Sequence, residues 1–272
     1  MGLFDCHVHT NHSLDARYPM EQQLAAAQAA GLDGIAITDH ADIDFYEPHR
    51  VRPRMEADVA EMREKRAAWA GRVELILGVE IGQALYGPQL AQGIIDRGGY
   101  DFIIGAVHSV RGVGGFYAMD MKQTGPEQVH DFLAAYFRDV EETVRTTDFD
   151  TLAHLTYPLR YIRQAVAFPV DYIPFEREIR RIMAILAGEG RAYELNLKPY
   201  QPDDGAWAGE EGWLLALFRE AGGEHVTLGT DAHTPDKVGY GLEAGMKLLK
   251  EKGFTQYTVY RQRRPCPVDL EV

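Results

Sequence analysis

Nine histidine and carboxylate side chains that could bind divalent metal ions recur along the chain: His7, His9, Asp15, His40, Glu80, His108, His154, Asp231 and His233. Mixed imidazole and carboxylate ligands suit zinc, iron or manganese, whereas a calcium site is built from oxygen. Nine ligands are too many for one ion, so the sequence predicts two or three. A bridging carboxylate would hold two ions roughly 3.5–4 Å apart, an arrangement used to cleave phosphoesters. Glu80, central in the order, is the predicted bridge.

Most of these residues directly follow a short apolar segment with the composition of a buried strand. Beyond a first strand that leads from residues 3–4 into the first histidines, strands are predicted at 34–38, 73–79, 102–107, 151–153, 192–195, 226–229 and 257–260. Helices are predicted at 19–30, 54–70, 126–145, 171–187, 210–221 and 235–252. Strands that alternate with helices indicate parallel βα units, either in a barrel or in a doubly wound open sheet. In a barrel, the carboxyl ends of the strands form the face on which active sites are built.

Composition limits the possible functions. The net charge of -13 argues against a protein that coats nucleic acid, which needs a basic surface. Arg261, Arg263 and Arg264 form the nearest basic cluster, and we interpret them as a solvated end. No secretory signal and no membrane-spanning apolar run is found, so a cytoplasmic protein is expected. Cys6 and Cys266 are too few for a disulfide framework, and Cys6 is expected to be a buried strand residue.

A set of short motifs resembles those of the PHP (polymerase and histidinol phosphatase) superfamily: DCHVHT at 5–10, SLD at 13–15, TDH at 38–40, GVEIG at 78–82, VHS at 107–109 and GTDAH at 229–233. The resemblance extends from residue 5 to about residue 240. It implies an α/β fold, a distorted (β/α)7 barrel with its metal site at the C-terminal ends of the strands. We find no linker and no internal repeat, so a single domain over residues 1–272 is expected.

The resemblance also implies how the ligands are shared. One ion would be held by His7, His9, Glu80 and Asp231, a second by Glu80, His108 and His154, and a third by Asp15, His40 and His233. Some family members carry histidine where this chain has Asp15, and His12 lies nearby, but the spacing from His9 favours Asp15. Asp5 and Asp39 are expected to orient neighbouring imidazoles, because metal-bound histidines usually need such partners.

Within the superfamily, the segments HLTYPLRY at 154–161 and ELN at 194–196 are similar to those of free-standing histidinol-phosphatases. This resemblance implies that Arg160 binds the substrate phosphate, for which a planar guanidinium is well suited. His40, Asn196 and Lys198 are further candidates for substrate binding. The loop at 111–120 (RGVGGFYAMD) departs from the family pattern and is expected to line the substrate pocket.

The predicted reaction is hydrolysis of a small phosphomonoester by a hydroxide that bridges two ions, with Glu80, Asp231, His233 and Arg160 as the catalytic set. His233, His40 or a water on a third ion would protonate the leaving group. Histidinol phosphate, an intermediate of histidine biosynthesis, is the leading substrate. Another phosphate ester, a nucleotide, or an exonuclease reaction is the alternative within this chemistry. The rivals of other classes are a metal-dependent amidohydrolase, for which a bridging lysine would be expected where His108 stands, and a non-catalytic binding protein.

Overall fold

The computed structural model describes residues 2–46, 51–115, 124–201 and 210–270. Its centre is a parallel sheet whose seven strands lie in sequence order: β1 (Phe4–Val8), β2 (Gly34–Ile37), β3 (Glu74–Gly82), β4 (Phe102–Ala106), β7 (Thr151–Leu152), β8 (Ala192–Asn196) and β9 (Val226–Gly229). A parallel bridge between Val8 and Ala232 joins the first strand to the segment after the last. The His9 amide donates to the Ala232 carbonyl oxygen at 2.9 Å. The sheet therefore curls into a distorted barrel, as predicted, and is not an open doubly wound sheet.

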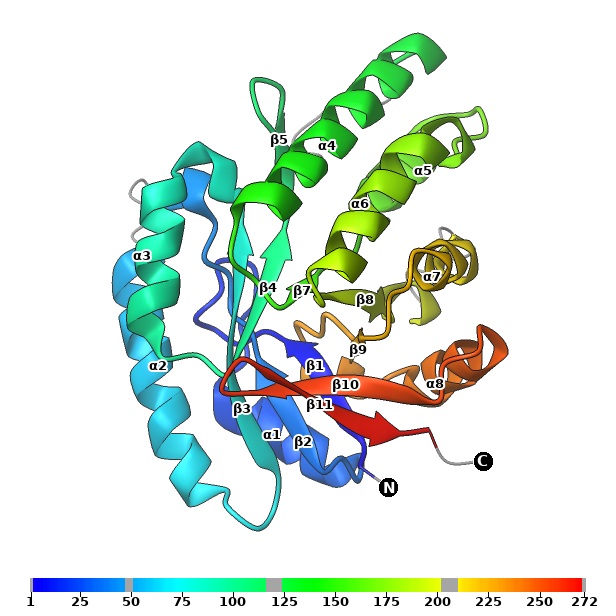
Figure 1. Cartoon of the computed structure of the whole chain (residues 1–272). Helices are drawn as coiled ribbons and strands as arrows, with labels where there is room; N and C mark the ends of the chain where they lie inside the picture. The colour runs from blue at the N-terminus through cyan, green and yellow to red at the C-terminus, as the bar shows by residue number, and fades with distance from the viewer. Residues whose placement is uncertain (1, 47–50, 116–123, 202–209, 271–272) are drawn as a thin grey trace.

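Helices surround the barrel on its outside (Figure 1). They are α1 (Met20–Ala29), α2 (Val51–Ala68), α3 (Pro88–Gly98), α4 (Pro126–Thr146), α5 (Tyr157–Ala165), α6 (Glu176–Gly188), α7 (Glu211–Glu220) and α8 (Leu242–Glu251). Short 3-10 turns lie at Ile43–Phe45, Ala84–Tyr86, Ile173–Phe175, Lys198–Tyr200 and Pro235–Lys237. The barrel strands are buried almost throughout, because they face side chains of the barrel interior on one side and helices on the other.

Most predicted elements form, with instructive differences. The helix predicted at 235–252 is divided, because Gly239 and Gly241 adopt positive φ angles of 75° and 83° and α8 begins only at Leu242. The helices α3 and α5 were not predicted. Both begin with a proline in the first turn, where the missing N–H costs nothing. Cys6 is buried in β1, as expected.

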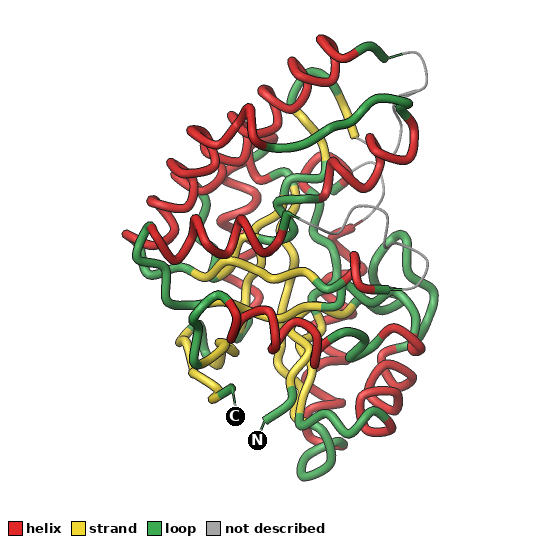
Figure 2. The backbone as a smooth tube through the Cα atoms, turned by 90° about the vertical axis from the view of Figure 1, so that its right-hand side faces the viewer, coloured by secondary structure: helices red, strands yellow, loops and turns green. Residues whose placement is uncertain are grey.

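A C-terminal hairpin of β10 (Gln256–Arg261) and β11 (Arg264–Asp269) lies across the amino ends of the barrel strands. In Figure 1 it crosses in front of the barrel, and both figures show the two termini close together (Figure 2). The Arg261 guanidinium makes two contacts of 2.6 Å with the Glu74 carboxylate at the start of β3. Arg263 Nε donates to Asp150 at 2.8 Å. The interpretation of these arginines as a solvated end was therefore wrong for Arg261 and Arg263.

Two further two-residue strands, β5 (Ser109–Val110) and β6 (Gly114–Gly115), form a small antiparallel pair beyond β4. No helix among the described residues is long and apolar enough to cross a membrane.

Candidate metal centre

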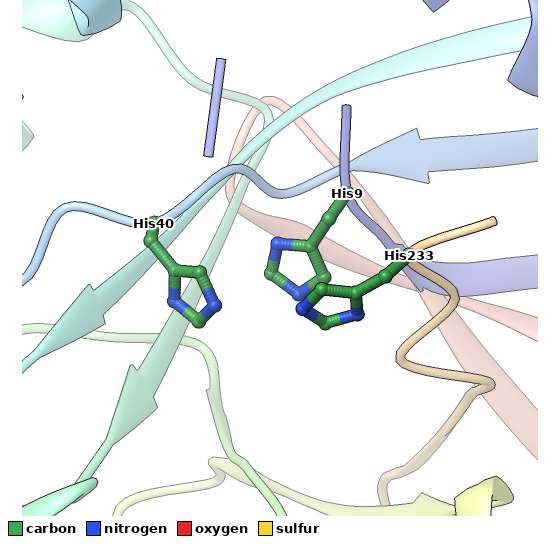
Figure 3. A group of neighbouring side chains, drawn as sticks. All are labelled: His9, His40 and His233. Carbon is green, nitrogen blue, oxygen red and sulfur yellow. The ribbon is translucent and has the colours of Figure 1, made fainter. Parts of the chain in front are cut away.

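The nine predicted ligands lie together at the carboxyl ends of the barrel strands. We call these nine the histidine–carboxylate cluster: His7, His9, Asp15, His40, Glu80, His108, His154, Asp231 and His233. Parallel strands end on the same rim, so residues that follow strands far apart in the sequence become neighbours. Figure 3 shows three of them, in which the rings of His9, His40 and His233 converge from separate segments of the chain. The His9 and His233 ring centres are 4.3 Å apart.

Glu80 lies at the middle of the cluster and is fully buried. Its Oε1 atom is 2.9 Å from His154 Nε2 and 3.1 Å from His108 Nε2. Its Oε2 atom faces the other imidazoles and lies 2.9 Å from His40 Nδ1, 3.4 Å from His7 Nε2 and 3.6 Å from His9 Nε2. The two oxygens of one carboxylate thus face two different groups of ring nitrogens, which is the geometry a bridging ligand needs.

The other two carboxylates of the cluster lie toward its edge. Asp231 Oδ1 is 3.3 Å from His9 Nε2 and 3.4 Å from His233 Nδ1. Asp15 Oδ2 is 3.0 Å from His233 Nε2, and Asp15 Oδ1 is 3.7 Å from His40 Nε2. The structure therefore gathers Asp15 beside two imidazoles. His12 Nε2 instead pairs with Glu61 at 2.8 Å.

Buried polar atoms without a hydrogen bond provide an independent test of whether a metal fits. His7 Nε2, His9 Nε2, His40 Nδ1 and Glu80 Oε2 are all buried, and none makes a hydrogen bond of acceptable geometry among the described residues. Each buried polar atom without a partner lowers the stability of the fold by its desolvation free energy, so four such atoms directed at one point are not expected unless something binds them. Nitrogen lone pairs around a carboxylate oxygen are a suitable donor set for a divalent transition metal. The residues fit such an ion.

Carboxylates behind the rings hold the imidazoles in place. His7 Nδ1 is 2.6 Å from Glu194 Oε1, so Nε2 faces Glu80. Gly229 makes room for this contact, because a Cβ there would lie 2.5 Å from Glu194 Oε1 and 2.5 Å from His7 Cβ. A carboxylate that supports a metal-bound imidazole in this way is common in metal sites. The sequence pointed to Glu194 only as part of the ELN motif at 194–196, without a role.

The two aspartates expected to orient imidazoles behave differently from each other. Asp39 accepts a hydrogen bond of 2.5 Å from Ser13 Oγ, which in turn lies 3.1 Å from His9 Nδ1, so it supports that ring through Ser13. Among the described residues, Asp5 makes no hydrogen bond to an imidazole ring. It accepts from the Thr230 hydroxyl at 2.5 Å and from the backbone N–H groups of His7, Thr230 and Gly239. Asp5 therefore organises the loop after β9, and the expectation for its side chain was wrong.

Charge in the cluster is concentrated around Glu80. Burial raises the pKa of Glu80, but the neighbouring His40, His108 and His7 hold it well below its usual range. Burial lowers the pKa of His108, yet Glu80 and Asp42 raise it to about 10. Burial lowers the pKa of His9 well below its usual range, and the nearby His233 and His40 act in the same direction. The Glu80 carboxylate thus favours positive charge on the imidazoles around it, but neighbouring protonated imidazoles repel one another. A divalent ion would supply the same positive charge without this repulsion.

A cavity of about 930 Å³ opens over the cluster. Asp15, His40, His108, His154, Asp231 and His233 line it, together with the cationic side chains of Arg160, Lys198 and Lys237 and the rings of Phe45, Tyr157 and Tyr161. Among the predicted substrate contacts, Arg160, His40 and Lys198 are thus at the cavity. The Lys198 ammonium also donates to Asp231 Oδ2 at 3.0 Å and to the Asp231 carbonyl oxygen at 3.2 Å.

Asn196 is the exception among those contacts. It is fully buried, and its amide donates to Glu194 Oε2 at 3.1 Å while its oxygen accepts from the Lys198 backbone N–H at 3.0 Å. The expectation that it touches substrate is therefore corrected: Asn196 lies behind the cavity and supports Glu194. Of the loop expected to line the pocket, residues 111–115 are not among the lining residues, and 116–120 lie outside the described residues.

Comparison with known proteins identifies the family. A model of the PHP domain matches residues 5–198, which hold most of the barrel and seven of the nine residues of the cluster. This chain belongs to the PHP domain family. The relationship predicted from the motifs is thus confirmed.

Curated relatives resemble this PHP chain over nearly its full length. A histidinol-phosphatase of Lactococcus lactis is 26% identical over 96% of this chain and 95% of its own. A probable histidinol-phosphatase of Deinococcus radiodurans is 27% identical over 98% and 99%.

The fold has a solved counterpart as well. A crystal structure of histidinol phosphate phosphatase from Lactococcus lactis, in complex with zinc, L-histidinol and phosphate, superimposes with a TM-score of 0.81 at 20% identity. The match covers 97% of this chain and 98% of that one, which confirms the barrel.

Proposed function

We propose that this chain is a metal-dependent phosphomonoesterase that hydrolyses L-histidinol phosphate. The observation that carries the proposal is that one cavity brings together two kinds of groups: six residues of the largely buried histidine–carboxylate cluster line it, and so do three cationic side chains. The likeness to curated histidinol-phosphatases, and to a structure that holds zinc, L-histidinol and phosphate, supports the substrate.

We assign the ligands by the family pattern, which the distances support in part. Three groups of ligand atoms lie within 4.8 Å of one another: His7, His9 and Glu80; His9, His40 and His233; and His40, Glu80 and His108. His7, His9, Glu80 and Asp231 would hold one ion, and Glu80, His108 and His154 a second. Asp15, His40 and His233 would hold a third. Bound divalent ions supply Lewis-acid activation of water and of the phosphoryl oxygens.

The remaining chemistry belongs to protein side chains. Arg160 lines the cavity from α5 and would bind phosphoryl oxygens through its planar guanidinium. Lys198 holds Asp231 through two hydrogen bonds and so fixes the carboxylate next to His9. His233 and His40 line the cavity, and when the third ion is absent either protonated imidazole would donate a proton to the alkoxide leaving group.

A substrate panel tests the proposal. The metal-supplemented protein is assayed for kcat/KM on histidinol phosphate, glycerol phosphate, a nucleoside monophosphate and an N-acyl amino acid, which represents the amidohydrolase alternative. We expect histidinol phosphate to have the highest kcat/KM. A higher value for any other member would refute the substrate assignment, and turnover of the amide alone would refute the reaction class.

A Glu80→Gln variant shows whether the activity belongs to the cluster. We expect it to lose activity and bound metal together, because it removes the charge shared between the two groups of imidazoles. The control is Glu251→Gln, which makes the same charge change at an exposed position on α8 and should leave both unchanged. Full activity with normal metal content in Glu80→Gln would refute the two-ion arrangement.

A further inference from the structure

Asp42, which sequence reasoning did not single out, lies next to His108. It precedes the 3-10 turn at Ile43–Phe45, and its side chain is 13% exposed. It lines the cavity over the cluster. Its Oδ2 atom is 3.9 Å from His40 Nδ1, and its Oδ1 atom makes the closer contact, 3.2 Å from His108 Nδ1. The other ring nitrogen, Nε2, faces Glu80 Oε1 at 3.1 Å and His154 Nε2 at 3.4 Å.

A glycine at the end of β3 makes the contact between Asp42 and His108 possible. A Cβ added at Gly82 would lie 1.8 Å from Asp42 Oδ1 and 3.1 Å from His108 Nδ1. The first distance is far below any real contact, so a side chain at 82 would displace the carboxylate. The φ angle of Gly82 is not positive, so its backbone conformation does not itself call for glycine. Glycine fits at position 82 because the Asp42 carboxylate occupies the space where a Cβ would lie.

The backbone of His108 is held separately from its ring. Gln83 Oε1 accepts a hydrogen bond of 2.9 Å from the His108 N–H, and Gln83 Nε2 donates to Asp44 Oδ1 at 3.1 Å. Removal of the Asp42 carboxylate would therefore release the ring while the main chain stays anchored. This separation distinguishes an effect on the imidazole from a general disruption of the loop.

Two other imidazoles of the cluster are held in the same way. The Nδ1 atom of His7 contacts Glu194, and the Nδ1 atom of His9 contacts Ser13, so that Nε2 faces the cluster in both. An imidazole that donates from Nδ1 keeps the lone pair of Nε2 free for a metal, whereas the other tautomer carries a proton there.

We propose that Asp42 is a positioning residue that sets the ring orientation and tautomer of His108, so that His108 binds the ion shared with Glu80 and His154. The inference rests on the metal centre of the proposed function and not on the identity of the phosphoester. Partners of this kind typically change metal affinity about 10–100-fold when removed.

Metal binding is the direct test. Zinc affinity and stoichiometry are measured by chelator competition and elemental analysis on the full chain, and the visible spectrum is recorded with cobalt. Asp42→Ala should weaken one ion about 10–100-fold, shift the cobalt spectrum, and leave the ion held by His7 and His9 unchanged. Asp131→Asn, which changes an acid with a 79% exposed side chain on α4, is the control and should bind as the wild type does.

A second variant tests the same contact without a change to either partner. Gly82→Ala should reproduce the defect, because the added methyl displaces the carboxylate. In the double variant Asp42→Ala/Gly82→Ala, the methyl no longer meets a carboxylate, and the released His108 ring can move away from its 3.1 Å contact with that methyl, so zinc affinity should be close to that of Asp42→Ala alone. Additive losses would overturn the proposal, as would wild-type zinc affinity in Asp42→Ala. A wild-type protein that binds zinc normally but does not hydrolyse phosphoesters would refute only the proposed function, whereas one that binds no divalent ion would overturn both.

Discussion

The Glu211 carboxyl group lies in the protein interior, 2% exposed, where α7 packs against β8. It accepts hydrogen bonds from the Thr156 hydroxyl at 2.8 Å and from the Tyr193 hydroxyl at 3.1 Å. Burial raises the pKa of Glu211 to about 8, against 4.5 for an ordinary glutamate, because these two bonds do not replace the lost hydration. The folded protein therefore keeps a proton there that the unfolded chain releases.

The sign of the pH dependence follows from that difference. Below pH 4.5 both states are protonated and Glu211 costs nothing. Between pH 4.5 and about 8 the unfolded chain gains stability by ionising, so the free energy of unfolding falls by about 1.4 kcal/mol for each pH unit. The difference of about 3.5 pH units between the two pKa values corresponds to roughly 5 kcal/mol, an upper value because relaxation around the buried charge lowers the cost.

Glu211→Gln removes this cost and keeps a side chain of the same shape. Its amide oxygen can accept from Thr156, and its NH2 group can donate to the Tyr193 oxygen. Urea unfolding of both proteins at pH 5 and pH 8.5, in the same metal-supplemented buffer, should give similar stabilities at pH 5 and a more stable variant at pH 8.5. Glu251→Gln on the surface is the control for the charge change. A stability difference that does not change with pH would refute the reasoning.

Three further substitutions test other parts of the structure. Arg160→Ala should raise KM for the phosphoester about 10–100-fold, since it removes a charge-assisted contact, and an unchanged KM would exclude it from phosphate binding. Lys198→Met should lower zinc affinity about 10–100-fold, measured by chelator competition, because it frees Asp231; unaltered affinity would contradict that role. Arg263→Ala should lower the free energy of unfolding in urea by about 1–3 kcal/mol, because it leaves Asp150 buried without its cation, and a loss under 0.5 kcal/mol would contradict this.

The pattern of apolar segments was sufficient for parallel βα units and for the gathering of the nine cluster residues, and the family resemblance decided for a barrel over an open sheet. Each strand is a short apolar segment, and most of the ligands follow one directly, so the parallel topology brings them to one rim. Most strand boundaries were predicted within a residue or two, but β3 continues to Gly82, so Glu80 lies within the strand and does not follow it, and β5, β6 and β11 were not predicted. The break in the helix predicted at 235–252 could not be predicted, because a glycine within a helical pattern can either stay in the helix or end it, and tertiary contacts decide which.

Contacts behind the ligands could not be predicted. Most metal-bound imidazoles have a partner at the second nitrogen, although His154 Nδ1 has none among the described residues. Which side chain reaches that nitrogen depends on strand register and loop path. Glu194 reaches His7 across β8, β9 and β1, and Asp42 reaches His108 over Gly82. The pairing of Arg261 with Glu74 likewise joins residues that are 187 positions apart, and no local pattern reports it.

The hairpin at the amino end of the barrel also affects how this protein behaves among copies of itself. Its outer strand, β11, has no second strand neighbour among the described residues, so one edge faces outward. Two of its six residues are Pro265 and Pro267, which pair with Tyr260 and Thr258 of β10. Proline has no N–H, so neither residue can donate a backbone hydrogen bond to a strand that binds at the outer edge. An incoming strand would find few N–H donors along the edge of β11, so this strand is a poor template for β-sheet aggregation.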